Sequence, residues 1–219
     1  MKEVKKVLLE GTGKASFGGA ALSSFTLTDE SFMRLLNYAG KSFGVFGDYG
    51  KGKVFAFGHN LIFDSNLNDS RKRLIQNTIG WMTGNKRRVS VGLLYKNGND
   101  WSHYGWGQLC PVIKAKFIET PEDFAGVDIV AVTYYGNWPT GLTPEVIEKL
   151  KAYVANGGNL FFGSHGWVWE HYGQYKQDNT LVYEKNFASY AILNVFGINV
   201  NRDFFSVSDA YDLTSTLTA

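Results

Sequence analysis

Residues 143–166 read TPEVIEKLKAYVANGGNLFFGSHG, and this stretch decides the fold class. Thr143 can cap a helix, Pro144 suits its first turn, and apolar residues then recur at helical spacing as far as the Asn-Gly-Gly sequence at 156–158. The apolar run that follows, at 159–162, predicts a strand buried on both faces. A helix that leads directly into a buried strand is typical of parallel strands joined by crossover helices.

The same alternation extends to both sides of this stretch. We predict strands at 89–94, 112–118 and 128–132, a helix that starts near residue 106 and ends at Pro111, a helix near 183–196, and a further strand at 198–200. Parallel strands with right-handed crossovers form a doubly wound sheet. The sequence therefore predicts an α/β domain with a doubly wound, mainly parallel sheet over residues 86–205.

Residues 1–85 predict an N-terminal β-rich extension packed on that main sheet. Two strands are expected at 44–46 and 54–57, with a short helix within 28–38. A longer helix begins at Asn68 or Asp69 and ends at Gly84. Residues 206–219 are polar and small, which is typical of a linker-like tail.

Composition excludes several classes of protein. The net charge of +2 over 219 residues does not favour a nucleic-acid-binding protein, and the basic run at 86–88 falls where a helix should end. Cys110 is the single cysteine, which rules out an internal disulfide and any multi-cysteine metal site. No stretch approaches the roughly 20 apolar residues of a membrane span.

Ligands of doubly wound sheets bind beyond the carboxyl ends of the strands, which here selects the loops 95–106, 134–141 and 163–173. These loops are rich in aromatic and histidine side chains, which suit sugar rings or peptide side chains. Packing of the same rings onto the sheet is an equal alternative. The candidate ligand-binding residues are Trp101, His103, Trp106, Tyr134, Tyr135, Trp138, Ser164, His165, Trp167, Trp169 and His171. His59 could line the same face, although a satisfied loop histidine is the favoured interpretation.

The sequence Gly163-Ser164-His165-Gly166 lies where a nucleophile elbow would form, since a strained turn needs small flanking residues. This layout resembles the class I glutamine-amidotransferase-like (flavodoxin-like) fold, but the cysteine nucleophile of that fold is missing. Ser164 and His165 are only weak catalytic candidates because no spacing rule supplies a base and an orienting acid. The sequence has no His-Glu-x-x-His, so neither a catalytic residue, a metal site nor a cofactor is assigned.

Three segments in order resemble a known family. They are FGVFGDYGKGKVFAFGH at 43–59, the following helix with Asn77 and Trp81, and ANGGNLFFG at 155–163 leading into WVW at 167–169. They resemble the amidotransferase-like accessory domain found before enhancin-like zinc metallopeptidases (peptidase family M-sixty) and in TRP-channel-associated factors. Lys53 stands where arginine is commoner in that family.

The resemblance implies a non-catalytic accessory module of a larger glycoprotein-directed zinc metallopeptidase, whose zinc chemistry belongs to another domain. The expected partners are a glycan or glycoprotein, or adjacent domains of the same polypeptide. An extracellular, cell-surface or periplasmic location is expected, although residues 1–6 lack the apolar core of a signal peptide and a cytoplasmic location stays open. Two alternatives remain: a small-molecule hydrolase that uses Ser164 with a nearby histidine, and a pure protein-interaction domain.

Overall fold

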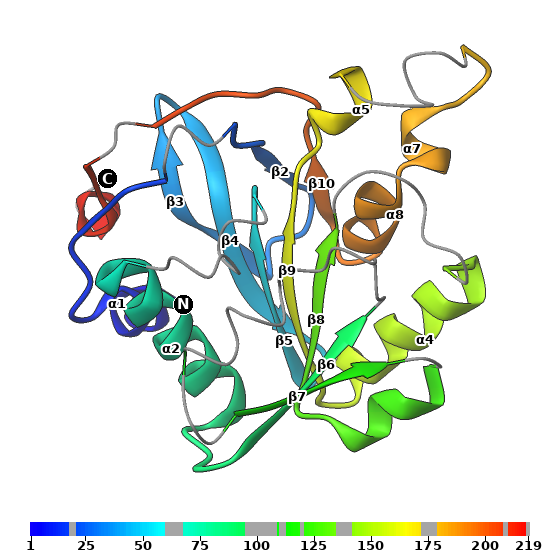
Figure 1. Cartoon of the computed structure of the whole chain (residues 1–219), viewed down its shortest axis with the longest axis horizontal. Coiled ribbons are helices and arrows are strands. Elements are labelled where there is room, and N and C mark those ends of the chain that lie inside the picture. The colour runs from blue at the N-terminus through cyan, green and yellow to red at the C-terminus, as the bar shows by residue number, and fades with distance from the viewer. Residues whose placement is uncertain are drawn as a thin grey trace.

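The structure is a computed structural model that describes residues 1–17, 21–59, 68–94, 109, 113–118, 121–134, 142–171, 179–207 and 210–217. Figure 1 shows a central sheet between two helical layers. The helices are α1 (Lys2–Leu9), α2 (Asp69–Thr83), α4 (Pro144–Ala155), α5 (Val168–His171), α7 (Tyr183–Asn186) and α8 (Ala188–Asn194), with 3-10 helices η2 (Pro121–Gly126) and η3 (Leu213–Leu217). The strands are β1 (Lys14–Ala15), β2 (Phe25–Leu27), β3 (Phe32–Tyr38), β4 (Lys41–Tyr49), β5 (Gly52–Phe57), β6 (Val89–Leu94), β7 (Ile113–Ile118), β8 (Ile129–Tyr134), β9 (Asn159–Ser164), β10 (Ile198–Val200) and β11 (Tyr211–Asp212).

The main sheet has seven strands in the order β3-β4-β5-β9-β8-β6-β7. Strands β5, β9, β8, β6 and β7 run parallel to one another, whereas β4 is antiparallel to both of its neighbours. The prediction of an α/β fold with a mainly parallel sheet is therefore confirmed.

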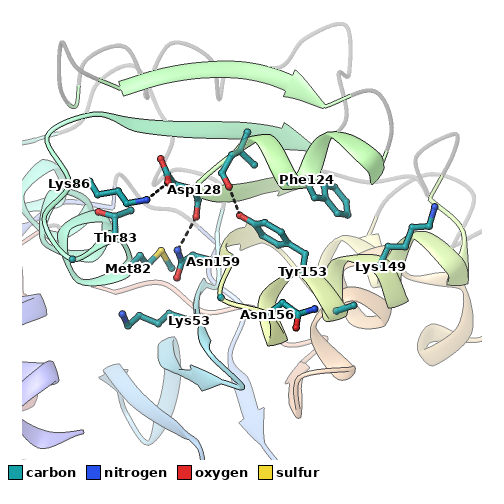
Figure 2. A pocket seen from close by; sticks show the side chains of 16 residues that line it. Lys53, Met82, Thr83, Lys86, Phe124, Asp128, Lys149, Tyr153, Asn156 and Asn159 are labelled. Atoms are coloured by element: carbon teal, nitrogen blue, oxygen red, sulfur yellow. Dashed lines mark hydrogen bonds and ion pairs between the residues drawn. The ribbon is translucent and has the colours of Figure 1, made fainter.

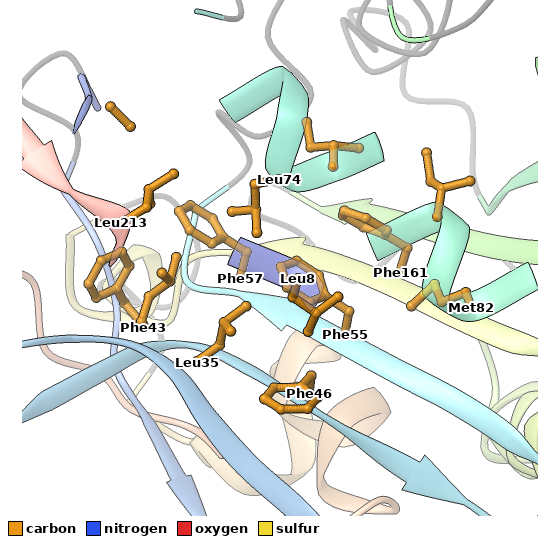
Figure 3. Close-up of a cluster of buried hydrophobic side chains, with 14 of the residues drawn as sticks. Leu8, Leu35, Phe43, Phe46, Phe55, Phe57, Leu74, Met82, Phe161 and Leu213 are labelled. Atoms are coloured by element: carbon orange, nitrogen blue, oxygen red, sulfur yellow. The ribbon is translucent and has the colours of Figure 1, made fainter. Parts of the chain in front are cut away.

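Side-chain alternation along the central strands divides the core between the two faces of the sheet. Phe55 and Phe161 point to the α1/α2 side, where their ring centroids lie 4.9 Å apart, and their neighbours along the strands point to the α4/α8 side. Figure 3 shows the first of these clusters, with Leu8 of α1 and Leu74 of α2 over the phenylalanines of β4, β5 and β9. Burial of each such side chain stabilises the fold by roughly 1.5–3 kcal/mol. Because both faces of the sheet carry such side chains, both helical layers are needed to cover it.

The predicted helix boundaries are confirmed where local chemistry determines them. The Asn68 side chain accepts a hydrogen bond from the Arg71 N–H at 2.9 Å, and α2 ends at Gly84 with φ of 64°. Thr143 caps α4 in the same way, accepting from the Val146 N–H at 3.4 Å. The strands expected at 89–94, 112–118, 128–132, 159–162 and 198–200 correspond to β6, β7, β8, β9 and β10.

The short helix predicted within 28–38 is wrong, because this segment contains strand β3. Its apolar residues have helix-like spacing, but the register between β3 and β4 shifts between Arg34 and Leu36. This irregularity lets the adjacent Leu35 and Leu36 both be buried, which breaks the alternation that would have indicated a strand. The single helix expected at 183–196 is instead the two short helices α7 and α8, separated at Phe187.

The two units predicted at 1–85 and 86–205 share one sheet, since β5 pairs with β9 from Lys53↔Asn159 to Phe57↔Gly163. The tail expected to be linker-like from residue 206 also contributes to the fold. Strand β11 pairs with β1, Leu213 is fully buried, and the Tyr211 hydroxyl donates to the Asn37 carbonyl at 2.7 Å. Among the described residues, no helix is long and apolar enough to cross a bilayer.

Candidate functional site

The carboxyl ends of β5 and β9 lie side by side because these strands are parallel neighbours. His59 follows β5 by two residues, and His165 directly follows β9. Two segments distant in sequence join them: β2 and β10 pair with each other, and Leu22 forms a bridge with Phe205. The edge is therefore built from the ends of two central strands and from the segments around residues 22 and 205.

The two histidines form a buried pair at this edge. Their ring centroids are 3.9 Å apart at an interplanar angle of 86°, and His59 and His165 are only 7% and 1% exposed. Burial lowers the pKa of His59 to about 2, helped by repulsion from His165 and Arg71. Burial also lowers the pKa of His165, to about 4. A hydrogen bond with the Ala21 backbone acts in the opposite direction but is the smaller effect. Both imidazoles are therefore neutral at physiological pH.

The turn after β9 is held by the hydroxyl of Ser23, which is fully buried. Its Oγ accepts hydrogen bonds from the Gly166 N–H at 2.8 Å and the Trp167 N–H at 3.1 Å, and donates to the Asp203 carbonyl at 3.0 Å. A Cβ on Gly166 would lie 1.9 Å from the Asn201 carbonyl oxygen. The backbone amides after the turn are thus already hydrogen-bonded, and the segment around Asn201 packs directly against them.

Asp203 holds in place the segment around Asn201, which packs against the turn after β9. Its carboxylate accepts from the Ser24 N–H and hydroxyl at 3.0 Å and forms an ion pair with Lys41 at 2.8 Å. Burial opposes ionisation of this carboxyl, but the bonds from Lys41 and Ser24 lower its pKa. The carboxylate is therefore charged and tied to both β4 and the segment that leads into β2.

An aromatic hollow of about 320 Å³ opens beside this turn, lined by Ala21, Trp167, His171 and Phe204. The Trp167 indole N–H donates to the Ala21 carbonyl at 2.7 Å, which fixes the ring. The His171 ring centroid lies 6.0 Å from that of Trp167 and 5.8 Å from that of Phe204. Phe204 is 58% exposed, so the hollow presents aromatic surface to solvent.

The structure brings three of the predicted residues together, namely His165, Trp167 and His171. Trp169 instead packs in a separate buried cluster with Tyr183 and Phe187. Trp101, His103, Trp106, Tyr135 and Trp138 lie outside the described residues, and for Tyr134 and Ser164 the described part is the backbone. Within the described part of the chain, no group of three or more His, Cys, Asp or Glu is arranged to hold a metal ion.

Sequence reasoning missed Ser23, Asp203 and Phe204. Ser23 and Asp203 are 180 positions apart, and neither lies in a recognisable motif. Phe204 lies beyond the strand expected at 198–200, outside any recognisable motif. His59, interpreted as a loop histidine, is a member of the buried pair.

The chain is thus an α/β domain in which the segment around Asn201 covers the turn after β9, and an aromatic hollow opens beside that turn. The family model TCAF_N, described as TRPM8, N-terminal domain, matches residues 128–215, less than half of the chain. No curated protein matches the chain.

Solved metallopeptidase structures share the fold. The IMPa metallopeptidase from Pseudomonas aeruginosa aligns with a TM-score of 0.71, and IMPa in complex with T-antigen aligns with a TM-score of 0.70. IMPa from Pseudomonas aeruginosa in complex with an O-glycopeptide gives 0.69. Identity is 11% in each case, and the alignment covers 99% of this chain but 24% of the metallopeptidase chain.

The family match supports the TRP-associated part of the resemblance, and the structural matches support its metallopeptidase-related part at the level of the fold. They do not bear on the amidotransferase-like part, which stays a prediction. At 11% identity the structural likeness concerns the fold alone.

Proposed function

We propose that this chain is a non-catalytic accessory module of a larger glycoprotein-directed metallopeptidase, and that its carboxyl edge holds a glycan-bearing ligand. The covered turn after β9 carries the proposal. A nucleophile elbow needs an accessible side chain and free backbone amides to stabilise an oxyanion. Here the amides of Gly166 and Trp167 are bonded to Ser23, and His165 is 1% exposed.

The aromatic hollow favours a role in binding a ligand over a role in catalysis. Sugar rings combine apolar faces with hydroxyl edges, and they pack on exposed aromatic rings. The hollow offers Phe204 and Trp167 for such packing, with the Arg202–Glu170 ion pair at 3.1 Å as a nearby source of polar contacts. The likeness to a fold found in a metallopeptidase solved with T-antigen and with an O-glycopeptide agrees with a ligand of this class.

Calorimetric titration with T-antigen and with an O-glycopeptide tests the proposal. Substitution Phe204→Ala should weaken binding roughly fivefold, because one aromatic packing contact contributes about 1 kcal/mol. Val182→Ala is the matched control, since Val182 is also an exposed apolar side chain, at 43%. Equal weakening by both variants would contradict a glycan site at the hollow. Equal binding of the unglycosylated peptide would favour the pure protein-interaction alternative.

The hydrolase alternative is tested separately with a small chromogenic ester. We expect Ser164→Ala to leave any background hydrolysis unchanged, because Gly166, in the turn that follows Ser164, packs against the segment around Asn201. A loss of saturable ester hydrolysis in Ser164→Ala, with an unchanged circular dichroism spectrum, would overturn the non-catalytic assignment.

A further inference from the structure

A groove of about 540 Å³ follows the outer surface of helix α2. The end of α1 borders it on one side, and the segment that leads into β6 borders it on the other. Among the described residues, this α2 groove shares no lining with the aromatic hollow, and Figure 1 shows α1 and α2 well away from α5. Ligands of α/β sheets usually bind at the strand ends, so the chemistry of the lining has to carry any assignment here.

One face of α2 forms the floor of the groove. Arg73, Gln76, Asn77 and Gly80 follow one another at spacings that place them on the same side of a helix. The residues that α2 buries against the sheet lie on the opposite side. The floor is therefore the solvent side of the helix, and its polar side chains are not part of the core.

Gly80 makes room for a polar side chain in this floor. Glycine is unfavourable in the interior of a helix, but here a Cβ would lie 2.6 Å from Asn85 Oδ1. Asn85 has a φ of 59°, and its N–H donates to the Gly80 carbonyl at 2.9 Å. The chain thus folds back over the last turn of α2 and lays the Asn85 carboxamide on the helix surface.

Two further carboxamides in the groove are oriented by the bonds that they donate. Gln76 Nε2 donates to the Leu109 carbonyl at 2.8 Å, and Asn77 Nδ2 donates to the carbonyls of Leu8 and Glu10 at 3.1 Å and 2.8 Å. Within the described part of the chain, neither carboxamide oxygen accepts a hydrogen bond, and neither is buried. Both oxygens can therefore accept from a ligand.

Trp81 and Arg73 supply donors beside these acceptors. The Trp81 ring is held from the sheet side, since the Phe46 ring meets it edge-on at 5.7 Å and Lys53 Nζ lies 5.6 Å from its centre. Its indole N–H has no acceptor among the described residues and is not buried. Arg73 is exposed and uses only Nε, which donates to the Glu10 carbonyl at 3.4 Å. Its two terminal nitrogens are left for a ligand.

Charge in the described lining is nearly balanced. Arg73 contributes one positive group, and Glu10 contributes one carboxylate. Lys86 also borders the groove, but its Nζ is paired with the Asp128 carboxylate at 2.7 Å, in the neighbouring hollow that Figure 2 draws. An ionic ligand would therefore find no excess of the opposite charge here.

The apolar part of the lining lies beneath these polar side chains. Ile79, Val89 and Leu109 are only 6%, 4% and 2% exposed, because they belong to the core. Of the described lining, Val7 alone is an exposed apolar side chain. A docked peptide helix needs a row of apolar anchors, which a single valine does not provide. The lining therefore favours a ligand that is polar and uncharged.

We propose that the α2 groove is a binding site for a neutral saccharide. Each sugar hydroxyl both donates and accepts, and neighbouring hydroxyls match planar side chains that present two polar atoms. Gln76 and Asn77 supply acceptors, Arg73 and Trp81 supply donors, and the Asn85 carboxamide supplies both. The site does not rest on the function proposed for the aromatic hollow, and either site can exist without the other.

Titration of the full chain with lactose and with N,N′-diacetylchitobiose, followed by protein NMR, tests this site. The indole N–H resonance of Trp81, assigned from the variant Trp81→Phe, should shift saturably with at least one of the two sugars. The shift should persist in Phe204→Ala, which alters the aromatic hollow and leaves the α2 groove intact. Loss of the shift in Phe204→Ala would place the sugar at the aromatic hollow and overturn the second site alone.

A double variant tests the groove itself. Arg73→Ala/Asn85→Gly removes two of the polar groups, and glycine keeps the positive φ of residue 85 unstrained. It should raise the dissociation constant at least about fivefold, because two hydrogen bonds to the sugar are lost. The matched control is Arg87→Ala/Asn179→Gly, which removes the same groups from exposed positions outside the groove. It should shift the dissociation constant less than about twofold.

Three results would each overturn the proposal. They are the absence of a saturable Trp81 shift with both sugars, equal weakening in the control, and an equal shift with benzyl alcohol, which offers a ring but a single hydroxyl. The first of these is measured on the unaltered chain, so it does not depend on the folding of any variant.

Discussion

At the scale of single residues, the Ser23 hydroxyl is the centre of the carboxyl edge. Ser23→Ala removes the acceptor of two backbone N–H groups, and the Gly166 N–H is buried. An unsatisfied buried donor costs roughly 1–3 kcal/mol, so we expect the free energy of unfolding to fall by about that amount. Urea denaturation measures the loss. Ser206→Ala, at an exposed position, should change stability by less than about 0.5 kcal/mol.

The buried histidine pair predicts a specific dependence of stability on pH. The folded-state pKa of His165 is about 4 and that of His59 about 2, both below the ordinary value of 6.5. The unfolded chain therefore binds more protons than the folded chain below about pH 6.5, and stability falls as the pH drops toward 4. Above pH 6.5 the two residues impose no such penalty.

Variants separate this effect from the titration of carboxyl groups. We expect His165→Gln to flatten the fall in the free energy of unfolding between pH 6.5 and 4, whereas Ser206→Ala, which removes no titratable group from an exposed position, should leave the slope unchanged. Urea denaturation at a series of pH values gives both slopes. Identical slopes in the wild type and in His165→Gln would mean that His165 is accessible to protons in the folded state.

At the scale of elements, the contact between the turn after β9 and the segment after β10 closes the carboxyl edge. Gly166→Ala would place a Cβ 1.9 Å from the Asn201 carbonyl oxygen, so one backbone must move. We expect a loss of more than about 2 kcal/mol in stability together with altered ligand binding at the aromatic hollow. Gly40→Ala is the control for a turn glycine, because its surroundings are open and only the φ of 79° adds strain.

How far the sequence predicts these elements depends on whether the deciding contact is local. The caps at Asn68 and Thr143 are local, and both helix starts were predicted correctly. Strand β3 was missed because its irregular pairing with β4 buries Leu35 and Leu36 together. The candidate site divides in the same way: the aromatic run at 167–171 is visible in the sequence, whereas its meeting with Phe204 depends on the fold.

At the scale of the whole molecule, the two halves of the chain depend on one sheet. Strand β9 lies between β5 and β8, so residues 86–217 without the first unit would expose the whole hydrogen-bonding edge of β9. That fragment would also lose α1, α2 and the phenylalanines of β4 and β5 that cover one face of β9. An unpaired edge in the middle of a buried sheet favours aggregation over folding.

We therefore expect the full chain to unfold in one cooperative transition and the fragment 86–217 to be unfolded or aggregated. Coincident urea transitions by tryptophan fluorescence and by far-ultraviolet circular dichroism would establish the single transition. Removal of residues 211–217 alone should be milder, since it strips Leu213 and Tyr211 from the α1/α2 side and leaves the seven-stranded sheet paired. A soluble 86–217 fragment with its own cooperative transition would instead show that the first unit is an independent addition to a complete domain.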